Sequence, residues 1–421
     1  MHLSPQAVLD KRKAHILPCL GHFYQDPPHF VRGHMQYLYD VDGREYLDFF
    51  AGVSVMNCGH SNPAIIEPVT KQIQNLQHVC NIYLTQGVAD LAERLGAVLP
   101  GNLSHSFFCN SGSEAMDGAM VLARSVTKRR KFIALVGGLH GRTQLTQSVT
   151  GIDMWRTDPF LSEESVFFID IAGDYDQALA QLQVLLTDHG QDIAAFIAEP
   201  IQGNAGIVTP PADFFTKVRE LLAPHGVLMI MDEVQTGFGR CGSMFACERY
   251  NVVPDIMAYA KALGNGFPLA GFSTTAELAA QFTKPSASTL GGNPVSATAG
   301  LAVLDYLQTQ DLPVRSRELG GYLQAGLIAL QKKHPCITEV RGMGLMLGAE
   351  IVTATGEPAP HIVDTVLERL KDQGIIIGRN GLARNVLAFQ PPLIIERADI
   401  ERVLTALDEV LGALDAIPAS S

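Results

Sequence analysis

The sequence of 421 residues predicts an α/β fold, in which a large domain with a mostly parallel sheet flanked by helices is joined to a smaller α+β domain. Three observations support this prediction. Apolar runs alternate with helical stretches, this order changes towards the C-terminus, and 47% of the residues are hydrophobic, which is enough for a large core. We expect an N-terminal segment over 1–50 that packs with the small domain, the large domain over 51–312, and the small domain over 313–421.

The large domain is predicted from short apolar runs that alternate with segments of helical apolar spacing. The expected strands are Ser106–Cys109, Phe132–Val136, Ser165–Ile169, Ile193–Ala198, Val227–Met231 and Ile256–Ala258. The expected helices between them include Ser113–Val126, Tyr175–Thr187 and Ala212–Leu222. Such alternation is typical of a parallel sheet covered on both faces, and these sheets bind ligands at the carboxyl ends of their strands.

The C-terminal part of the chain has a different order of elements, which indicates a smaller α+β unit. A long helix is expected first, and a Pro391-Pro392 break separates the last short strand from the last helix. The expected elements are a helix over Arg315–Lys333, a strand-like stretch over Thr338–Ile351, a helix over His361–Gln373, short strands over Ile375–Ile377 and Val386–Phe389, and a helix over Ala398–Leu414.

The composition excludes several classes of protein. Lys and Arg number 31 against 43 Asp and Glu, a net charge of −12 without a long basic run, so nucleic acid is not an expected partner. The seven scattered cysteines form no CxxC pair, which argues against a disulfide framework and a zinc ribbon. Charges precede any apolar run at the N-terminus, and no run is long enough for a membrane span. We therefore expect a cytoplasmic protein without a membrane or metal partner.

A serine- and glycine-rich turn over Asn110–Ala115 directly follows an expected strand and opens an expected helix. Free backbone N–H groups and hydroxyls at the positive end of a helix form a cradle for phosphate. The alternative is a helix cap without a ligand, with Ser111 or Ser113 as the N-cap residue. This motif alone does not decide between the two interpretations.

Two further motifs follow apolar runs. The run Val227–Met231 ends in Asp232 and Glu233, and buried carboxylates are costly unless their charges are used. An aspartate at this place can keep a ring nitrogen protonated or bind a metal, but histidine ligands are lacking nearby. Lys261 follows the next run among small residues, where a desolvated lysine has a lowered pKa and suits Schiff-base chemistry. Pyridoxal phosphate needs this combination of phosphate turn, aspartate and lysine.

At this point the sequence resembles the class III aminotransferases, which are fold-type I enzymes dependent on pyridoxal 5'-phosphate (PLP). The resemblance covers nearly the whole chain. The matching segments are Tyr37–Phe49, Asn57–His60, Ser111–Ala115, Glu199–Gly203, Asp232–Arg240, Ala260-Lys261 and Ser288–Pro294. A fold-type I architecture with PLP as cofactor is what the resemblance implies.

The resemblance also implies roles for individual residues. Lys261 and Asp232 are the catalytic pair, because Lys261 carries PLP and moves a proton while Asp232 pairs with the pyridinium nitrogen. Gln235 lies near the phenolic oxygen of the ring, and Thr289 reaches the phosphate of a neighbouring subunit, which implies a homodimer with shared active sites. The remaining cofactor-binding residues are Ser111, Gly112, Ser113, Leu139, His140, Glu199 and Val234.

The sequence departs from the family pattern at several positions that face the substrate. Leu139 replaces a stacking aromatic residue, whereas Arg142 matches an arginine that binds the distal carboxylate of ω-amino acids, the alternative being a structural ion pair. Relatives that use glutamate pair a Glu with an Arg, and here Asn204 and Ala388 stand at those places. The expected substrate-binding residues are Val53, Tyr83, Arg142, Asn204 and Arg384.

The loss of both halves of this Glu–Arg pair favours a reaction with one substrate. We expect a PLP-dependent ammonia-lyase that acts by β-elimination on a small anionic primary amine such as 1-hydroxy-2-aminoethylphosphonate and gives phosphonoacetaldehyde; ethanolamine phosphate is a related possibility. The alternative is an aminotransferase that passes the amine of an ω-amino acid to pyruvate or glyoxylate. A PLP-binding protein without catalysis is disfavoured, because Lys261, Asp232 and the phosphate turn are all intact.

Overall fold

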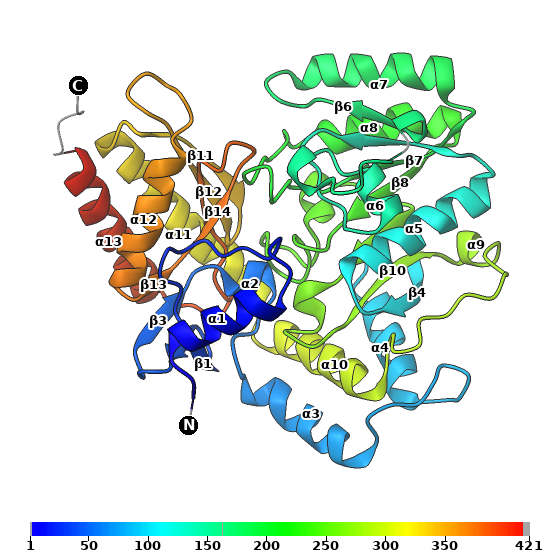
Figure 1. Ribbon diagram of the computed structural model, residues 1–421. Coiled ribbons are helices and arrows are strands. Elements are labelled where there is room, and N and C mark those ends of the chain that lie inside the picture. Colours follow the sequence, from blue (N-terminus) through cyan, green and yellow to red (C-terminus); the bar gives the residue numbers. More distant parts are fainter. Residues whose placement is uncertain (1, 162, 416–421) are drawn as a thin grey trace.

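The computed structural model describes residues 2–161 and 163–415. Figure 1 shows two bodies side by side, a larger one with the central sheet and a smaller one that contains the C-terminal helices. In the larger body seven strands form one sheet in the order β4-β10-β9-β8-β7-β5-β6. These strands are β4 (Leu103–Cys109), β10 (Ala270–Thr275), β9 (Ile256–Tyr259), β8 (Leu228–Asp232), β7 (Ile193–Ala198), β5 (Lys131–Leu135) and β6 (Val166–Ile169).

The predicted α/β class is confirmed, and one strand of the large sheet was missed by the prediction. All neighbouring strands from β9 to β6 run parallel, whereas β10 is antiparallel to both β4 and β9. The sequence of β10 contains serine, threonine and glycine, so it lacks the apolar run that marked the other strands. Its Ser273 is nevertheless buried, because Ser106 and Tyr259 satisfy the hydroxyl at 2.7 Å each.

Helices cover both faces of the large sheet, because successive residues of each strand point to opposite faces. On one face α5 packs through Met116 and Ala119 against Ile197 and Ile230. The other face carries Phe196 and Met229 against residues of α7 and α8. The helices of this body are α3 (Pro63–Asn75), α4 (Gln86–Gly96), α5 (Gly112–Thr127), α6 (Gln144–Ser148), α7 (Tyr175–His189), α8 (Phe214–Leu222), α9 (Ala276–Ala279) and α10 (Pro294–Thr309).

The smaller body contains a four-stranded sheet in the order β11-β12-β15-β14. The stretch predicted as one strand-like element is a hairpin instead, because Gly344 has a φ of +56° and turns the chain between its two strands. The elements are α11 (Leu312–Lys333), β11 (Ile337–Met343), β12 (Met346–Ile351), α12 (Pro360–Asp372), β14 (Gly378–Asn380), β15 (Val386–Phe389) and α13 (Arg397–Asp415).

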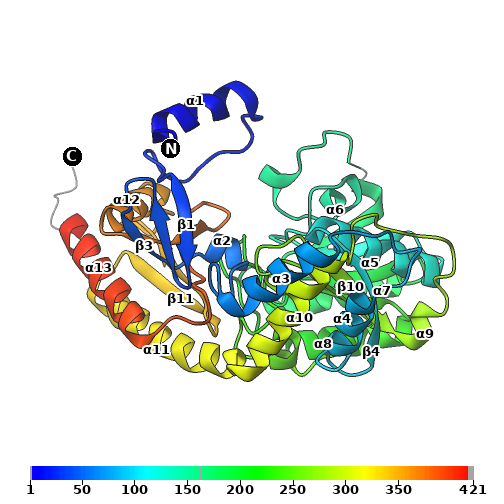
Figure 2. The ribbon, with the colours of Figure 1, turned by 90° about the horizontal axis from the view of Figure 1, so that it is seen from below.

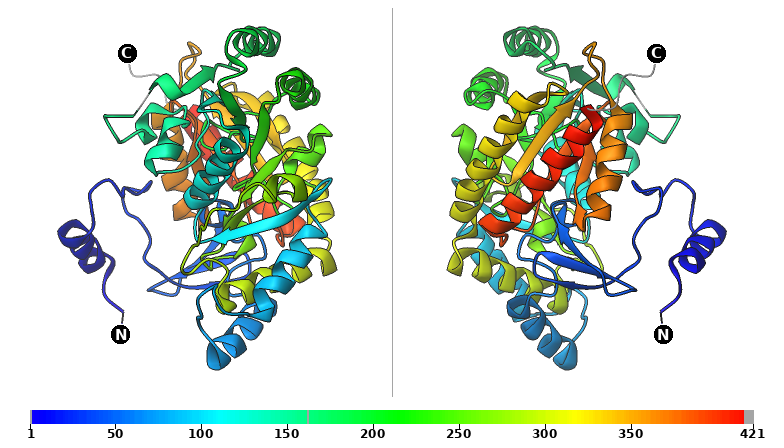
Figure 3. Two further views of the ribbon diagram at one scale, coloured as in Figure 1. Left: turned by 90° about the vertical axis from the view of Figure 1, so that its right-hand side faces the viewer. Right: turned by 90° about the vertical axis from the view of Figure 1, so that its left-hand side faces the viewer.

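A third sheet joins the N-terminal segment to this body. Its order is β1-β2-β3-β13, with β3 parallel to β13 through the pairs Leu47–Ile375 and Asp48–Ile376. Helix α1 has no buried residue, and Figures 2 and 3 show it standing away from the rest of the chain. These elements are α1 (Pro5–His15), β1 (Phe30–His34), β2 (Tyr37–Asp40), β3 (Glu45–Asp48), the turn α2 (Ala51–Ser54) and β13 (Ile375–Ile376).

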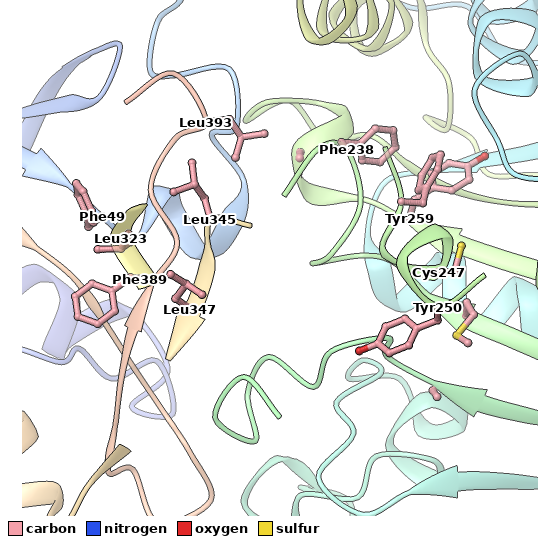
Figure 4. Close-up of a cluster of buried hydrophobic side chains, with 14 of the residues drawn as sticks. Phe49, Phe238, Cys247, Tyr250, Tyr259, Leu323, Leu345, Leu347, Phe389 and Leu393 are labelled. Carbon is pink, nitrogen blue, oxygen red and sulfur yellow. The ribbon is translucent and has the colours of Figure 1, made fainter. Parts of the chain in front are cut away.

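The interior is a large apolar core that extends into both bodies. Figure 4 shows Phe49, Leu347 and Phe389 on the side of the smaller body and Phe238 and Tyr259 on the side of the larger one. We propose domain boundaries near residues 51 and 313, since the strands of the large sheet all lie between them. Among the described helices, none is long and apolar enough to cross a membrane.

Candidate active site

A cavity of about 430 Å³ opens where the strands of the large sheet end. Residues that directly follow β4, β5, β7, β8 and β9 line it, as expected for ligand binding at the carboxyl edge of a parallel sheet. The lining brings together predicted residues from five separate segments of the chain. They are Ser111, Gly112, Ser113, Leu139, His140, Glu199, Asn204, Asp232, Val234, Gln235 and Lys261.

The turn before α5 has the properties of a helix cap and also those of a phosphate cradle, the two alternatives that the sequence left open. The Ser111 hydroxyl accepts a hydrogen bond from the N–H of Glu114 at 3.3 Å and therefore caps the helix. Gly112 and Ser113 also line the cavity at the positive end of this 16-residue helix. A Cβ on Gly112 would lie 3.0 Å from Val234, so a larger residue would crowd this wall of the cavity.

The carboxylate of Asp232 is buried and held by two donors. Its Oδ2 lies 2.8 Å from Nδ1 of His140, and its Oδ1 accepts from the N–H of Val234 at 3.1 Å. His140 is itself buried, and its Nε2 has no hydrogen-bond partner among the described residues. The aspartate therefore presents a fixed, negatively charged edge to the cavity, as a pyridinium ring nitrogen requires.

A second buried carboxylate, Glu199, stands behind the same wall. Its oxygens accept from the N–H of Leu139 at 2.8 Å and of Gly203 at 3.1 Å. Burial, with a further contribution from the charge of Asp232, raises the pKa of Glu199 to about 7. The charge of His140 and the two backbone hydrogen bonds act against this rise.

Lys261 begins a short turn after β9 and faces the cavity. Its φ of +42° lies in the left-handed region, which costs energy for a residue with a side chain. Burial lowers the pKa of the Lys261 amine, although the charges of Glu199 and Asp232 act in the opposite direction. The neutral amine that nucleophilic chemistry needs is favoured by this desolvation.

The amide of Gln235 lies deep in the cavity wall, where Gln390 meets it. Nε2 of Gln235 donates to Oε1 of Gln390 at 3.1 Å, and the hydroxyl of Ser54 donates to the same oxygen at 3.0 Å. All three side chains are buried. The sequence prediction missed Gln390 and Ser54; the only signal was a polar glutamine between an apolar strand and Pro391.

Ser54 belongs to a turn with unusual backbone geometry. Ala51, Gly52, Val53 and Ser54 all have positive φ, between +50° and +66°. For the β-branched Val53 this conformation is rare and unfavourable. The turn is held by Asp48, whose Oδ1 accepts from two backbone N–H groups at its start while its Oδ2 binds a histidine.

The predicted substrate-binding residues, Asn204 excepted, lie outside the lining of the cavity. Arg142, Tyr83, Arg384 and the cofactor residue Thr289 are exposed, and Val53 is half-buried. The backbone N–H of Arg142 donates to the Ser113 hydroxyl at 3.1 Å, which places this arginine beside the phosphate turn. The lining also contains residues that were not among the predicted site residues: Val55, Asn110, Gly141, Ala260, Gly266, Phe267, Pro268 and Leu269.

The surface beside the phosphate turn is apolar and exposed. Ile82, Tyr83, Leu84 and Leu290 are all highly exposed there. The loops that carry them touch, since Nδ2 of Asn81 donates to a backbone oxygen of the 283–292 segment at 3.3 Å. Exposed apolar patches of this kind are typical of interaction surfaces.

The donor set of this cavity fits PLP. A helix N-terminus with hydroxyls suits the phosphate, a fixed carboxylate suits the ring nitrogen, and a desolvated amine suits the aldehyde. The buried Nε2 of His140 and Oε1 of Gln235 lack protein partners among the described residues, so polar capacity remains in and around the cavity wall.

The chain is similar to known proteins in both sequence and structure. The family model described as "Aminotransferase class-III" matches residues 25–411. The alanine–glyoxylate aminotransferase 2 homolog 2, mitochondrial, of Arabidopsis thaliana is 39% identical, over 96% of this chain and 87% of that protein. A phospholyase from Arthrobacter in complex with phosphoethanolamine has 30% identity and a TM-score of 0.90, over 98% of this chain and 100% of its own. A PLP-bound amine transaminase from an uncultivated Pseudomonas species has 27% identity and a TM-score of 0.88, over 95% and 98% of the two chains.

Proposed function

The chain belongs to the class III aminotransferase family, whose members use PLP, and from this premise we propose that it is a PLP-dependent ammonia-lyase. Its proposed substrate is a small primary amine with an anion at the far end and a leaving group on the carbon next to the amine-bearing carbon. The compound that we propose is 1-hydroxy-2-aminoethylphosphonate, which would give phosphonoacetaldehyde and ammonia.

One observation carries the proposal, namely that neither position of the expected Glu–Arg pair, Asn204 or Ala388, has a charged side chain. Asn204 lines the cavity where glutamate-dependent relatives are expected to have a carboxylate. Ala388, at the place of the partner arginine, is fully buried in β15 between Gly348 and Gly378. Without that guanidinium, position 388 has no group to bind the α-carboxylate of a glutamate co-substrate, so a reaction with a single substrate suits the site better.

The proposed roles of the residues follow from their geometry. When bound, PLP supplies an electron sink for the negative charge left on the amine-bearing carbon. Lys261 Nζ takes the proton from that carbon, since burial favours its neutral form. Asp232, oriented by His140 and the N–H of Val234, holds the proton of the ring nitrogen. The hydroxyl on the adjacent carbon then departs as water with the proton that Lys261 took up, and hydrolysis by one water gives one aldehyde and one ammonia without a keto acid.

The far anion of the substrate is assigned to Arg142 in this proposal. Arg142 is exposed beside the phosphate turn, and no salt bridge joins its side chain to a described carboxylate. We also propose a homodimer in which the apolar loops around Tyr83 and Leu290 pack against a second copy and Thr289 serves the neighbouring site. The similarity to a phospholyase in complex with phosphoethanolamine supports a substrate that is both an amine and a phosphorus anion.

The deciding experiment supplies racemic 1-hydroxy-2-aminoethylphosphonate to the PLP-loaded enzyme without any keto acid. We expect ammonia and aldehyde to accumulate in equal amounts, far beyond the enzyme concentration, while the cofactor absorbance remains that of PLP. Ammonia limited to one equivalent per active site, or no ammonia at all, would contradict the lyase proposal.

The second candidate is an aminotransferase, favoured by the 39% identity to an alanine–glyoxylate aminotransferase homologue. In that case β-alanine or γ-aminobutyrate would convert the cofactor once to its amine form. Pyruvate or glyoxylate would then restore the original absorbance. Absorbance follows both half-reactions. The aminotransferase would show one loss and one return of the PLP band, whereas the lyase would keep the band and release ammonia without a keto acid.

A further inference from the structure

We propose that Gln390 is a positioning residue, which fixes the carboxamide of Gln235 in the wall of the cofactor cavity through hydrogen bonds shared with Ser54. The inference rests on PLP as the cofactor and on Gln235 facing it. It holds for a lyase and for an aminotransferase alike, so its failure and the failure of the proposed reaction are distinguishable.

Three distant segments of the chain meet at one oxygen atom. Gln390 directly follows β15, Gln235 follows β8, and Ser54 ends the turn after β3. Oε1 of Gln390 accepts from the Ser54 hydroxyl at 3.0 Å and from Nε2 of Gln235 at 3.1 Å. Ser54 and Gln390 are fully buried and Gln235 is 5% exposed, so the loss of either bond leaves a buried polar group without its protein partner.

The two amides are coupled in orientation. If Gln235 turned over alone, two carbonyl oxygens would face each other; if Gln390 turned over alone, two NH₂ groups would do so. The outer atoms of the pair, Oε1 of Gln235 and Nε2 of Gln390, have no protein partner within the described part of the chain. Gln235 therefore takes its orientation from Gln390, and its remaining polar capacity is left for a ligand.

The surroundings hold this pair tightly. A Cβ on Gly203 would lie 1.8 Å from Oε1 of Gln235, so only glycine at that position leaves room for the amide. The backbone of Gln390 is also fixed, because its N–H donates to the oxygen of Phe49 at 2.8 Å. Gly203 therefore borders the Gln235 amide closely, and the main chain fixes the position from which the Gln390 side chain starts.

The turn that delivers Ser54 is held in a strained conformation. Four consecutive positive φ values, with the β-branched Val53 among them, cost energy that the fold has to offset. Asp48 offsets part of it by accepting from the N–H groups of Phe50 and Ala51 at 2.9 and 2.8 Å. The strain brings the Ser54 hydroxyl to Gln390, and Val55 next to it lines the cavity.

An amide held in one orientation offers the cofactor a constant polar group. When Gln390 loses its amide, Gln235 becomes free to turn over and presents a mixture of donor and acceptor. The holoenzyme should then bind PLP more weakly, and the pH at which its visible absorbance band changes should shift. A purely structural role of Gln390 would lower stability without moving that pH.

The test compares Gln390→Met with the unmodified holoenzyme. We expect about three- to tenfold weaker PLP binding, the range for one lost buried hydrogen bond, together with a shifted pH dependence of the absorbance band. Ser54→Ala should shift both in the same direction by less. Leu387→Ala is the matched control, because Leu387 is fully buried in β15, the strand that directly precedes Gln390, and carries no hydrogen-bonding side chain.

The proposal also predicts that Gln390 acts only through Gln235. Replacing Gln390 by Met in a Gln235→Met background should therefore leave the absorbance band and the PLP affinity where Gln235→Met alone puts them. Unchanged absorbance in Gln390→Met, an equal shift in Leu387→Ala, or additive effects in the double variant would overturn the proposal. If Gln390→Met does not fold, Ser54→Ala decides, and a Ser54→Ala holoenzyme without any shift overturns it.

Discussion

The two sides of the candidate active site are built in different ways. On the cofactor side, Asp232, His140 and Glu199 are buried and fixed by hydrogen bonds within the chain. On the proposed substrate side, Arg142 and Arg384 are exposed, and the backbone N–H of Arg142 donates to the hydroxyl of Ser113. The hydrogen bonds that fix these three buried residues thus all lie within one chain, whereas the two arginines are exposed.

The contrast between buried and exposed site residues indicates which of them can be replaced without loss of the fold. Buried charges that hold one another cannot be changed singly without leaving an unpaired charge. Exposed residues can be exchanged at little cost in stability. A family that keeps one cofactor but catalyses different reactions would vary the residues of the substrate side and keep those of the cofactor side.

The largest expected effect on the cofactor side comes from Lys261→Ala. Loss of the amine removes the group that binds PLP and moves the proton, so turnover should fall below detection, by more than about 10³-fold. Steady-state ammonia or amine-transfer rates measure the loss. Lys217→Ala, at an exposed lysine paired with Asp213, is the control and should keep the rate.

Asp232→Asn should cost about 10²- to 10³-fold in kcat, because an amide no longer stabilises a positive ring nitrogen. The neighbouring Glu233→Gln is a matched control. Glu233 is also buried, but its carboxylate binds Thr236 and the N–H of Cys247 and does not line the cavity. Equal losses in both variants would mean that buried charge in general, and not the position of Asp232, matters.

Glu199→Gln tests the cofactor side through stability. In the folded state the pKa of Glu199 is raised from 4.5 to about 7, so the folded protein holds a proton there that the unfolded chain has lost. The contribution of Glu199 to the free energy of unfolding is therefore fully present below pH 4.5 and is lost as the pH rises to 7. At 1.4 kcal/mol per pKa unit, the loss amounts to about 3 kcal/mol.

The measurement is urea unfolding of the cofactor-free protein at pH 5 and pH 8. The unmodified protein should lose more stability across this interval than Glu199→Gln does, and the difference isolates the one group. A Glu199→Gln protein with the same pH dependence as the unmodified one would show that Glu199 is not protonated in the fold.

Arg142→Ala is expected to have the smallest effect, and on the substrate side alone. Loss of a charged hydrogen bond to the substrate anion should raise KM about 10- to 100-fold, with the PLP absorbance and the melting temperature unchanged. Arg384→Ala, at a second exposed arginine, serves for comparison. If only Arg384→Ala raises KM, then the anion is bound at the other arginine.

The sequence was informative where local patterns decide the structure. The six predicted strands of the large sheet form. Three motifs, namely the turn at Ser111, Asp232 and Lys261, were predicted because each follows an apolar run, and all three line the cavity. Strand β10 was missed, since its Ser273 and Thr274 are buried only because neighbouring strands satisfy their hydroxyls. Such tertiary compensation leaves no pattern in a single sequence.

The same reason explains what was missed in the candidate site. Gln390 and Ser54 are more than 300 positions apart, and each alone looks like an ordinary polar residue near a turn. The left-handed turn around Val53 could not be foreseen either, because a β-branched residue predicts extended backbone. Roles on the substrate side stay predictions, as Arg142 and Tyr83 do not line the cavity of one chain.

The pairing of β3 with β13 has a consequence for biosynthesis. Leu47 leaves the ribosome more than 300 residues before its partner Ile375. Until then β3 has a free edge, which is a place where growing chains associate wrongly. Gln390 follows Ile375 along the chain, so a polypeptide that has been made only as far as β13 would have Lys261 and Asp232 without the glutamine that meets Gln235.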